Sequence, residues 1–257
     1  MKYWILISSF VHIAGFAQTY PHEIAHAHND YAQNNPLFDA LENGFTGIEA
    51  DVHLVHGALL VAHNHPGDNA KTLDALYLKP LDSIARQNGG LIYANHNIPV
   101  VLLIDIKTDA EATYKAIAEL LFAYEKSLNT PTHKGAIQIV ISGNRPIDLI
   151  RTDPRHLSAL DGRPEDIGKR MTSAEMPWIS ENYNKIIKWN GTGSPSASEY
   201  RQLQELALRV HAENKKLRLW AIPDNVNAWR VLLDAGIDII NTDKLQELNT
   251  FLLNGKL

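Results

Sequence analysis

Short, almost continuously apolar runs alternate with helical patterns along most of the chain, and this alternation limits the folds that it can adopt. The run Val100-Val101-Leu102-Leu103-Ile104 has no polar face, as expected for a parallel strand that is covered on both sides. Parallel strands need long crossover connections, which helices usually provide. About eight strand-then-helix units fit a (β/α)8 barrel within 257 residues. An open doubly wound sheet is the alternative, but no Gly-rich phosphate loop follows the first strand. The prediction is therefore an α/β protein with one TIM-barrel domain over residues 18–257.

The expected elements include one antiparallel hairpin, because a turn at His56-Gly57 joins the second and third strands. The predicted strands are Glu23–His26, Gly47–Leu54, Leu59–His63, Val100–Ile106, Ala136–Ile141, Leu157–Ala159, Pro177–Ser180, Leu217–Ile222 and Ile237–Asn241. The predicted helices are Leu37–Glu42, Leu73–Gln87, Ala110–Leu128, Ser198–Asn214, Asn225–Ala235 and Lys244–Leu253. Ser198 and Asn225 stand at N-cap positions, and Gly236 ends its helix. Residues 162–200 are less regular and are expected to form a long loop over one end of the barrel.

The first residues form a short apolar stretch that is typical of a secretory signal peptide. Residues 1–17 combine Lys2, an apolar core and the small-residue exit Gly15-Phe16-Ala17. A membrane anchor is the alternative, but the run is short for a bilayer span and His12 interrupts it. We expect cleavage after Ala17 and export to the periplasm or the extracellular space. No later stretch is apolar enough to span a membrane, so no transmembrane anchor is expected after cleavage.

Charge and cysteine content exclude several classes of function. The formal net charge is -5, and no basic stripe is present, so we expect neither a nucleic-acid partner nor docking on an anionic membrane. The chain has no cysteine, which excludes a disulfide framework. Any contact with a phosphorylated substrate must therefore come from a local group of residues.

Acidic side chains occur in a strand-alternating pair. Glu49 and Asp51 are two residues apart in Gly47-Ile48-Glu49-Ala50-Asp51-Val52, so they project to the same face of a strand. Adjacent carboxylates repel each other, and a hard divalent ion bound through oxygen removes that conflict. Asp105 and Lys107 repeat the arrangement at the end of an apolar strand. A metal for Asp105 and an anion for Lys107 would offset the cost of burying them.

Histidines stand on both sides of the acidic pair. His26 ends the first predicted strand and His63 ends the hairpin strand, so both are expected at the rim where the carboxyl ends of barrel strands meet. Imidazoles at this rim can supply an acid, a base or a nucleophile. His28 is an alternative to His26, and His65 is an alternative to His63. His53 lies on the face of the acidic pair and is a candidate neighbour of the metal.

The order of motifs along the chain resembles that of the phospholipase-C-like phosphodiesterases, which include glycerophosphodiester phosphodiesterases and spider-venom sphingomyelinase D. The strongest resemblance is to bacterial and fungal proteins similar to altered inheritance of mitochondria protein 6. It covers residues 26–248, and it implies the barrel fold. The motifs that carry it are His28-Asn29-Asp30-Tyr31, Pro36-Leu37-Phe38-Asp39-Ala40-Leu41, Glu49-Ala50-Asp51-Val52, Leu73–Leu81, Asp105-Ile106-Lys107, Trp220–Asp224 and Asn241–Asp243.

The resemblance implies one divalent cation, Mg2+ or Ca2+, held by Glu49, Asp51 and Asp105. It also implies that Lys107 binds a phosphate oxygen and takes part in catalysis, and that Trp220 lines the substrate pocket. The chain departs from glycerophosphodiester phosphodiesterases, because it lacks their H-R-G and P-E-N-T motifs and has Asp105 in place of their third metal-binding glutamate. These departures weaken the transfer of substrate specificity more than the transfer of phosphodiesterase chemistry.

The resemblance further implies two catalytic histidines, one for attack at phosphorus and one that protonates the leaving oxygen. His63 matches the second. For the first, the H-x-x-N pattern favours His26 over His28, with Asn29 as its companion in substrate binding.

These features predict a secreted, metal-dependent phosphodiesterase that cleaves a phosphodiester of a glycerophospholipid or its headgroup fragment. We expect a monomer whose partner is that small phosphodiester or lipid headgroup. A second hypothesis is a zinc metallohydrolase of the amidohydrolase or polymerase-and-histidinol-phosphatase type, based on His26-x-His28. The pair Asp105-Lys107 suits Mg2+ or Ca2+ better. A third hypothesis is a non-catalytic barrel that binds lipid or phospho-sugar.

Overall fold

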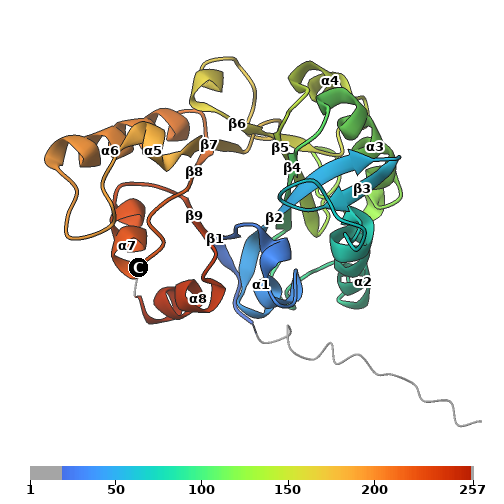
Figure 1. The fold of residues 1–257 in the computed structure, drawn as a ribbon, viewed down its shortest axis with the longest axis horizontal. Helices are drawn as coiled ribbons and strands as arrows, with labels where there is room; N and C mark the ends of the chain where they lie inside the picture. The colour runs from blue at the N-terminus through green and yellow to red at the C-terminus, as the bar shows by residue number, and fades with distance from the viewer. Residues whose placement is uncertain (1–18, 256–257) are drawn as a thin grey trace, which may run out of the picture.

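A closed barrel of eight parallel strands forms the centre of the molecule, as predicted. The computed structural model describes residues 19–255, so the expected signal peptide lies outside the described residues. The strands follow the order β1-β9-β8-β7-β6-β5-β4-β2, and β1 pairs with β2 to close the ring (Figure 1). β3 (Ala58–Val61) pairs antiparallel with β2 and confirms the early hairpin. The barrel strands are β1 (His22–Ala27), β2 (Phe45–Val55), β4 (Val100–Ile106), β5 (Ile137–Gly143), β6 (Ala159–Gly162), β7 (Trp178–Asn182), β8 (Lys216–Trp220) and β9 (Ile239–Thr242).

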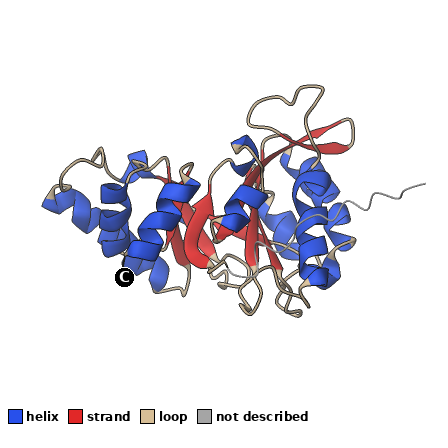
Figure 2. Cartoon of the chain, turned by 90° about the horizontal axis from the view of Figure 1, so that it is seen from below, coloured by secondary structure: helices blue, strands red, loops and turns tan. Residues whose placement is uncertain are grey.

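Helices surround the strands, as Figures 1 and 2 show from two directions. They are α1 (Phe38–Glu42), α2 (Lys79–Gln87), α3 (Ala110–Phe122), α4 (Ile147–Thr152), α5 (Tyr183–Ile186), α6 (Ala197–His211), α7 (Val226–Asp234) and α8 (Leu245–Asn254). A π-helical turn η3 (Asp74–Leu78) leads into α2, and short 3-10 turns are η2 (Asp30–Ala32), η4 (Glu125–Ser127) and η5 (Pro164–Asp166). None of the helices within residues 19–255 is long and apolar enough to cross a membrane.

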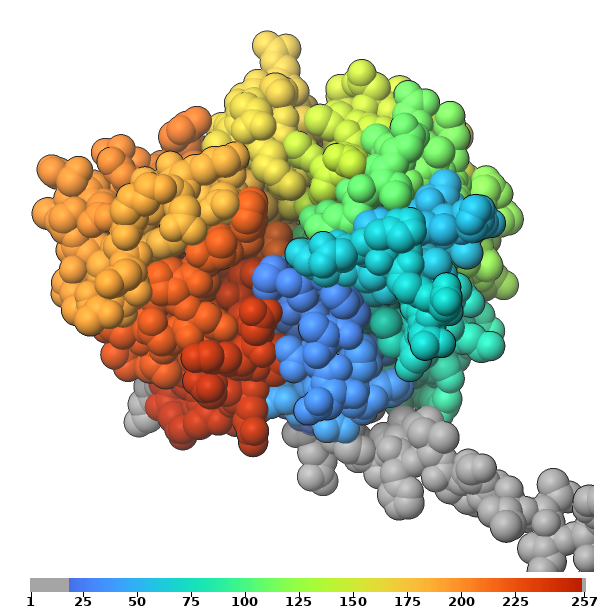
Figure 3. Space-filling view, in the orientation of Figure 1, coloured from blue at the N-terminus to red at the C-terminus, as the bar shows by residue number. Residues whose placement is uncertain are grey.

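The two ends of the described chain meet at the seam of the barrel. β1 pairs with β9 through the register Ala25–Ile240 and His26–Asn241, and it pairs with β2 on its other side. The space-filling view shows N-terminal residues packed directly against C-terminal residues (Figure 3). Ring closure therefore brings residues from the first and last strands to the same barrel mouth.

Side-chain alternation divides the inside of the barrel into an apolar floor and a polar mouth. Val101 and Leu103 of β4 point inward and join a small interior cluster with Trp178. The next inward position on β4 is Asp105, whose register partner on β5 is Ser142. Leu102 and Ile104 alternate with these residues and belong to the larger core outside the barrel. Polar groups therefore begin where the apolar floor ends, at the carboxyl ends of the strands.

Two expectations about the C-terminal half are wrong. The stretch 162–200 is not one long loop, because it contains β7, α5 and the start of α6. The N-cap of α6 is Ser196 and not Ser198. The Ser196 hydroxyl accepts from the backbone N–H of Glu199 at 3.2 Å, and the Glu199 carboxylate accepts from the backbone N–H of Ser196. β7 matches the predicted strand Pro177–Ser180, whereas α5 has only four residues, too few to show a clear hydrophobic period. The N-cap at Asn225 is confirmed.

Candidate active site

A cavity of about 180 Å³ opens at the carboxyl ends of the barrel strands. A larger depression of about 750 Å³ lies around Arg230 and Phe251, near α7 and α8, but its lining includes no histidine. The smaller cavity is lined by several of the residues that the sequence predicts for the site. Its lining residues are His28, Asn29, Glu49, His63, Asp105, Lys107, Ser142, Arg163, Arg218 and Trp220.

Three predicted acidic residues converge beside this cavity. Glu49, Asp51 and Asp105 each place a carboxylate oxygen within 4.8 Å of the other two. The parallel register of β2 and β4 sets Asp51 opposite Asp105, which explains the convergence. Within the described chain, Oδ1 of Asp51 is buried and has no hydrogen-bond partner. Three carboxylates, one of which has an unsatisfied oxygen, fit a hard divalent cation such as Mg2+ or Ca2+.

Lys107 bridges two of these carboxylates. Its Nζ lies 3.1 Å from Oδ2 of Asp51 and 3.0 Å from Oδ1 of Asp105. Burial lowers the pKa of Lys107, but the charges of Asp105 and Asp51 outweigh it and hold the pKa above its ordinary value. Burial raises the pKa of Asp105 to about 6; Lys107 opposes this rise and the charge of Asp51 adds to it. The cluster thus keeps a cationic group next to the predicted metal ligands.

Two buried nitrogen donors, from Arg218 and His26, contact the carboxylate of Glu49. Arg218 of β8 is buried and contacts Oε2 of Glu49 through Nη2, and its Nε donates to Asn241 at 3.0 Å. The Nε2 of His26 lies 3.1 Å from the same Glu49 oxygen. Burial raises the pKa of Glu49, but Arg218 and His26 outweigh it and lower the pKa to about 2. Glu49 is therefore ionised at neutral pH.

His26 does not reach the cavity, contrary to the expectation from the sequence. Its ring is fully buried and stands edge-on to Trp178, and burial together with the charge of Arg218 lowers its pKa to about 4. His26 pairs in register with Gly47 of β2. Gly47 is the inward-facing position that precedes Glu49 on that strand, further from the barrel mouth. His28 is two residues further along the same face, so it is His28 that lines the cavity.

Carboxylates orient both histidines of the cavity. Nδ1 of His28 lies 2.9 Å from Oδ1 of Asp243, and Nδ1 of His63 lies 3.0 Å from Oδ2 of Asp51. Burial lowers the pKa of His28, but the hydrogen bond to Asp243 and the charge of Glu49 outweigh it and raise the pKa above its ordinary value. In each ring the bond at Nδ1 leaves Nε2 for a ligand.

Asn29 and Trp220, the predicted substrate-binding residues, also line the cavity. Asn29 has left-handed backbone angles, with φ 46. The hydroxyl of Tyr31 lies 2.7 Å from Oδ1 of Asn29 and 2.8 Å from Oδ2 of Asp51. Tyr31 therefore links the first motif to the acidic cluster.

Comparison with known proteins identifies the family. Residues 16–159 match the model of the AIM6-like phosphodiesterase domain. The chain belongs to this family. The protein is 27% identical to altered inheritance of mitochondria protein 6 of Eremothecium gossypii, over 88% of this chain and 68% of that protein. It is 23% identical to the homologue of Arthroderma benhamiae, over 85% of this chain and 80% of that protein.

The fold of this AIM6-like domain is similar to that of a solved glycerophosphodiester phosphodiesterase from Parabacteroides distasonis. The TM-score is 0.56 at 15% sequence identity, and the match covers 91% of this chain and 98% of that structure. The likeness confirms the predicted (β/α)8 barrel fold.

Three cavity residues of the AIM6-like domain were not predicted: Ser142, Arg163 and Arg218. Arg218 could have been identified from the sequence, because a charged residue between two leucines in a predicted strand is unusual. It also shares the strand face of Trp220. Ser142 and Arg163 follow the predicted ends of their strands. Nothing in their local sequence separates them from loop residues.

Proposed function

We propose that this AIM6-like domain is an exported, divalent-metal-dependent phosphodiesterase that acts on the headgroup diester of a glycerophospholipid or a soluble fragment of one. The observation that carries the proposal is the oxygen triad with its unsatisfied Asp51 atom, next to two oriented imidazoles in one cavity. The amino-terminal segment 1–17, with its signal-peptide composition, supports the export part of the proposal.

The charge of the cluster suits a cation and a phosphodiester together. Glu49, Asp51 and Asp105 oppose Lys107 and Arg218, which leaves one excess negative charge. A divalent cation would reverse the sign to one positive charge, which complements the single negative charge of a phosphodiester. When bound, such a cation supplies Lewis-acid stabilisation of negative charge on the phosphoryl oxygens.

The remaining chemistry belongs to side chains of the cavity. Lys107 binds a phosphoryl oxygen and shares its negative charge. His63, oriented by Asp51, accepts a proton from the attacking hydroxyl at Nε2. His28, whose raised pKa favours the protonated form, donates its proton to the leaving oxygen as the phosphorus–oxygen bond breaks. This assignment replaces His26 by His28 and moves leaving-group protonation from His63 to His28.

The size of the cavity favours a small substrate. Its volume of about 180 Å³ is below the range of roughly 300–1,000 Å³ that is usual for drug-sized ligands. Most of the lining side chains are polar, and Trp220 is the one large aromatic among them. A headgroup fragment therefore fits this cavity better than an acyl chain does.

The test is a panel of phosphodiesters assayed with the purified protein. Bis(p-nitrophenyl) phosphate, glycerophosphodiesters and lysophospholipids would each be assayed with Mg2+ or Ca2+, with EDTA, and after the metal is restored. We expect turnover with metal, loss with EDTA and recovery on re-addition. Full turnover in EDTA would exclude the proposed metal dependence. Tightly held zinc in the purified protein would favour the metallohydrolase hypothesis, although buried His26, bound to Glu49, is poorly placed for an H-x-H zinc site.

A further inference from the structure

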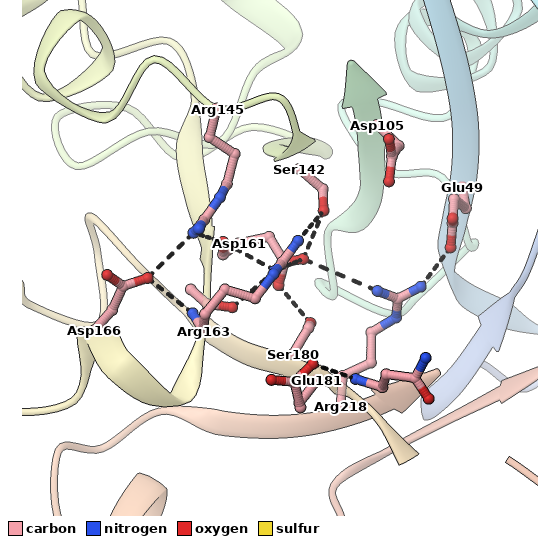
Figure 4. A network of polar contacts seen from close by, with 12 residues as sticks. Glu49, Asp105, Ser142, Arg145, Asp161, Arg163, Asp166, Ser180, Glu181 and Arg218 are labelled. Atoms are coloured by element: carbon pink, nitrogen blue, oxygen red, sulfur yellow. Dashed lines mark hydrogen bonds and ion pairs between the residues drawn. The ribbon is translucent and has the colours of Figure 1, made fainter. Parts of the chain in front are cut away.

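Arg163 lines the same cavity but has no part in the machinery described above. It follows β6, and its backbone N–H donates to Oδ2 of Asp166 at 2.9 Å. Its Nη1 donates to Oδ2 of Asp161 at 2.7 Å and to the carbonyl of Gly162 at 2.9 Å, and its Nη2 donates to Oγ of Ser142 at 3.2 Å. These contacts hold the guanidinium group in one place at the barrel mouth (Figure 4).

One edge of the Arg163 guanidinium is left for a ligand. The group has five N–H donors in a planar fork. Among the described residues its hydrogen bonds use Nη1 and one N–H of Nη2. The N–H of Nε and the second N–H of Nη2 remain, and these are the two donors that bind a carboxylate or phosphate side-on. The side chain is 20% exposed, and it borders the cavity.

Asp161 anchors Arg163 but does not occupy that free edge. The buried Asp161 carboxylate also accepts from the hydroxyls of Ser142 at 2.8 Å and Ser180 at 2.5 Å. A second guanidinium, that of Arg218, lies 4.0 Å from the same carboxylate. One negative charge is therefore shared by two guanidinium groups and two hydroxyl donors. Burial lowers the pKa of Arg163, but the charge and hydrogen bond of Asp161 outweigh it, so Arg163 stays cationic.

We propose that Arg163 forms a second anion site for a carboxylate or an additional phosphate on the ester substituent of the substrate. This inference rests on the proposed phosphodiesterase function and narrows its substrate class to diesters with a second negative group. In Figure 4, Glu49 and Asp105 stand on one side of the network, and the Arg163 guanidinium stands beside Ser142 on the other. Because Glu49, Asp105 and Arg163 line one cavity, a substituent of a phosphoryl group bound near the acidic triad can reach Arg163.

Matched pairs of glycerophosphodiesters test the site. Glycerophosphoserine and glycerophosphoethanolamine differ by one carboxylate; glycerophosphoinositol 4-phosphate and glycerophosphoinositol differ by one phosphate. We expect the native protein to prefer the anionic member of at least one pair, and the responding pair distinguishes carboxylate from phosphate. Arg163→Gln should raise KM for that anionic member about ten- to hundredfold, as for loss of a charge-assisted hydrogen bond, and change KM for its neutral partner less than about threefold.

Arg145 provides the matched control. Its Nη1 donates to the carbonyl of Asp161 at 2.5 Å and to Oδ2 of Asp166 at 3.2 Å, so it supports the same segment as Arg163. It is not among the residues that line the cavity. Arg145→Gln should lower the thermal unfolding temperature as Arg163→Gln does, without changing the preference between the members of a pair.

Binding measurements separate this inference from the proposed function. Calorimetric titration of the same compounds into the His63→Ala protein, with and without Arg163→Gln, reports affinity without turnover. Selective binding of the anionic member with no turnover of any diester by the native protein would refute the phosphodiesterase and still support the anion site. Turnover without selectivity would refute the anion site alone. Four results would overturn the anion site. Arg163→Gln could weaken the binding of both members equally, or weaken neither. Arg145→Gln could show the same selective loss, or none of the compounds could bind.

Discussion

Nε2 of His26 lies 3.1 Å from Oε2 of Glu49, and the histidine ring has no exposed surface. The Arg218 guanidinium contacts the same carboxylate oxygen. Two donors, one from β1 and one from β8, therefore fix the position of a predicted metal ligand. Since burial and the charge of Arg218 lower the pKa of His26 to about 4, the imidazole is neutral at pH 7 and acts as a hydrogen-bond donor that positions Glu49.

Substitution of the two histidines of the first strand should therefore have unequal effects. Glutamine can replace the Nε2 donor of His26, so His26→Gln should retain kcat within about tenfold if the residue only positions Glu49. His28→Gln removes the proposed proton donor and should lower kcat by about 10²- to 10⁴-fold. Steady-state kinetics on the two purified variants, with circular dichroism to verify folding, measures the difference. The reverse order of activities would restore His26 as the catalytic histidine.

Removal of the buried Asp51 carboxylate should weaken metal binding directly. Asp51→Asn leaves the size of the side chain unchanged but removes a charge beside the unsatisfied Oδ1 atom. We expect the affinity for Mg2+ or Ca2+, measured by calorimetry, to fall at least about tenfold, with turnover lost and the fold retained. Asp82→Asn is the control, because Asp82 is also buried and hydrogen-bonded, by Ser127, but lies outside the cavity. An unchanged metal affinity in Asp51→Asn would exclude the triad as the metal site.

The contact between His28 and Asp243 predicts the pH dependence of the reaction. A general acid must be protonated, so kcat/KM should fall as pH rises through the pKa of His28. The Asp243 carboxylate helps to hold that pKa above its ordinary value. Asp243→Asn should therefore shift the alkaline limb of the pH–rate profile to lower pH. A limb that does not move in this variant would mean that another group donates the proton.

Asp30 should make the stability of the fold depend on pH in an uncommon direction. Burial raises its pKa to about 6, against 3.8 ordinarily, although Leu37 N–H and the Tyr77 hydroxyl donate to its Oδ2. Between pH 4 and 6 the folded protein therefore binds a proton more readily than the unfolded chain does, so this group lowers stability as pH rises. Asp30→Asn removes the titration and should gain stability over the native protein, by up to about 3 kcal/mol at pH 7. Urea unfolding at pH 4.5 and 7.5 measures both proteins. A constant difference between them would contradict the raised pKa.

Strand positions were predictable here because most of the parallel strands are short apolar runs without a polar face. All nine predicted strands overlap observed strands, and the inward alternation from Leu103 to Asp105 places the acidic triad correctly. The choice between His26 and His28 was not predictable, because both residues lie on one strand face. Alternation does not show how far along the strands the apolar interior of the barrel extends. That extent depends on Trp178, which comes from a distant part of the chain and packs inside the barrel against His26.

Arg163 shows a second limit of prediction from sequence. Its contacts depend on Asp161 of the strand that it follows and on Ser142 at the end of the neighbouring strand β5. A single arginine after a strand has no local period or motif, so its sequence gives no sign of the cavity. The partner of Arg218 is more remote still, since Glu49 is 169 residues away along the chain.

Gly143 at the end of β5 should be needed for the position of Asp105. Its φ is +69, and a Cβ at this residue would lie 2.3 Å from Oδ1 of Asp105 and 2.4 Å from the carbonyl oxygen of Ile106. Gly143→Ala therefore combines backbone strain with a clash against backbone and a predicted metal ligand. Gly57→Ala is the control, since φ there is +81 and nothing lies within 4 Å of the added Cβ.

The two glycine variants separate strain from clash. Strain alone costs about 1–2 kcal/mol, so Gly57→Ala should lose about that much unfolding free energy and keep full activity. Gly143→Ala should lose more, and its kcat/KM should fall at least about tenfold because Asp105 must move. Urea unfolding and steady-state kinetics measure both effects. If Gly143→Ala matched Gly57→Ala in both, the close approach of β5 to Asp105 would have no part in building the site.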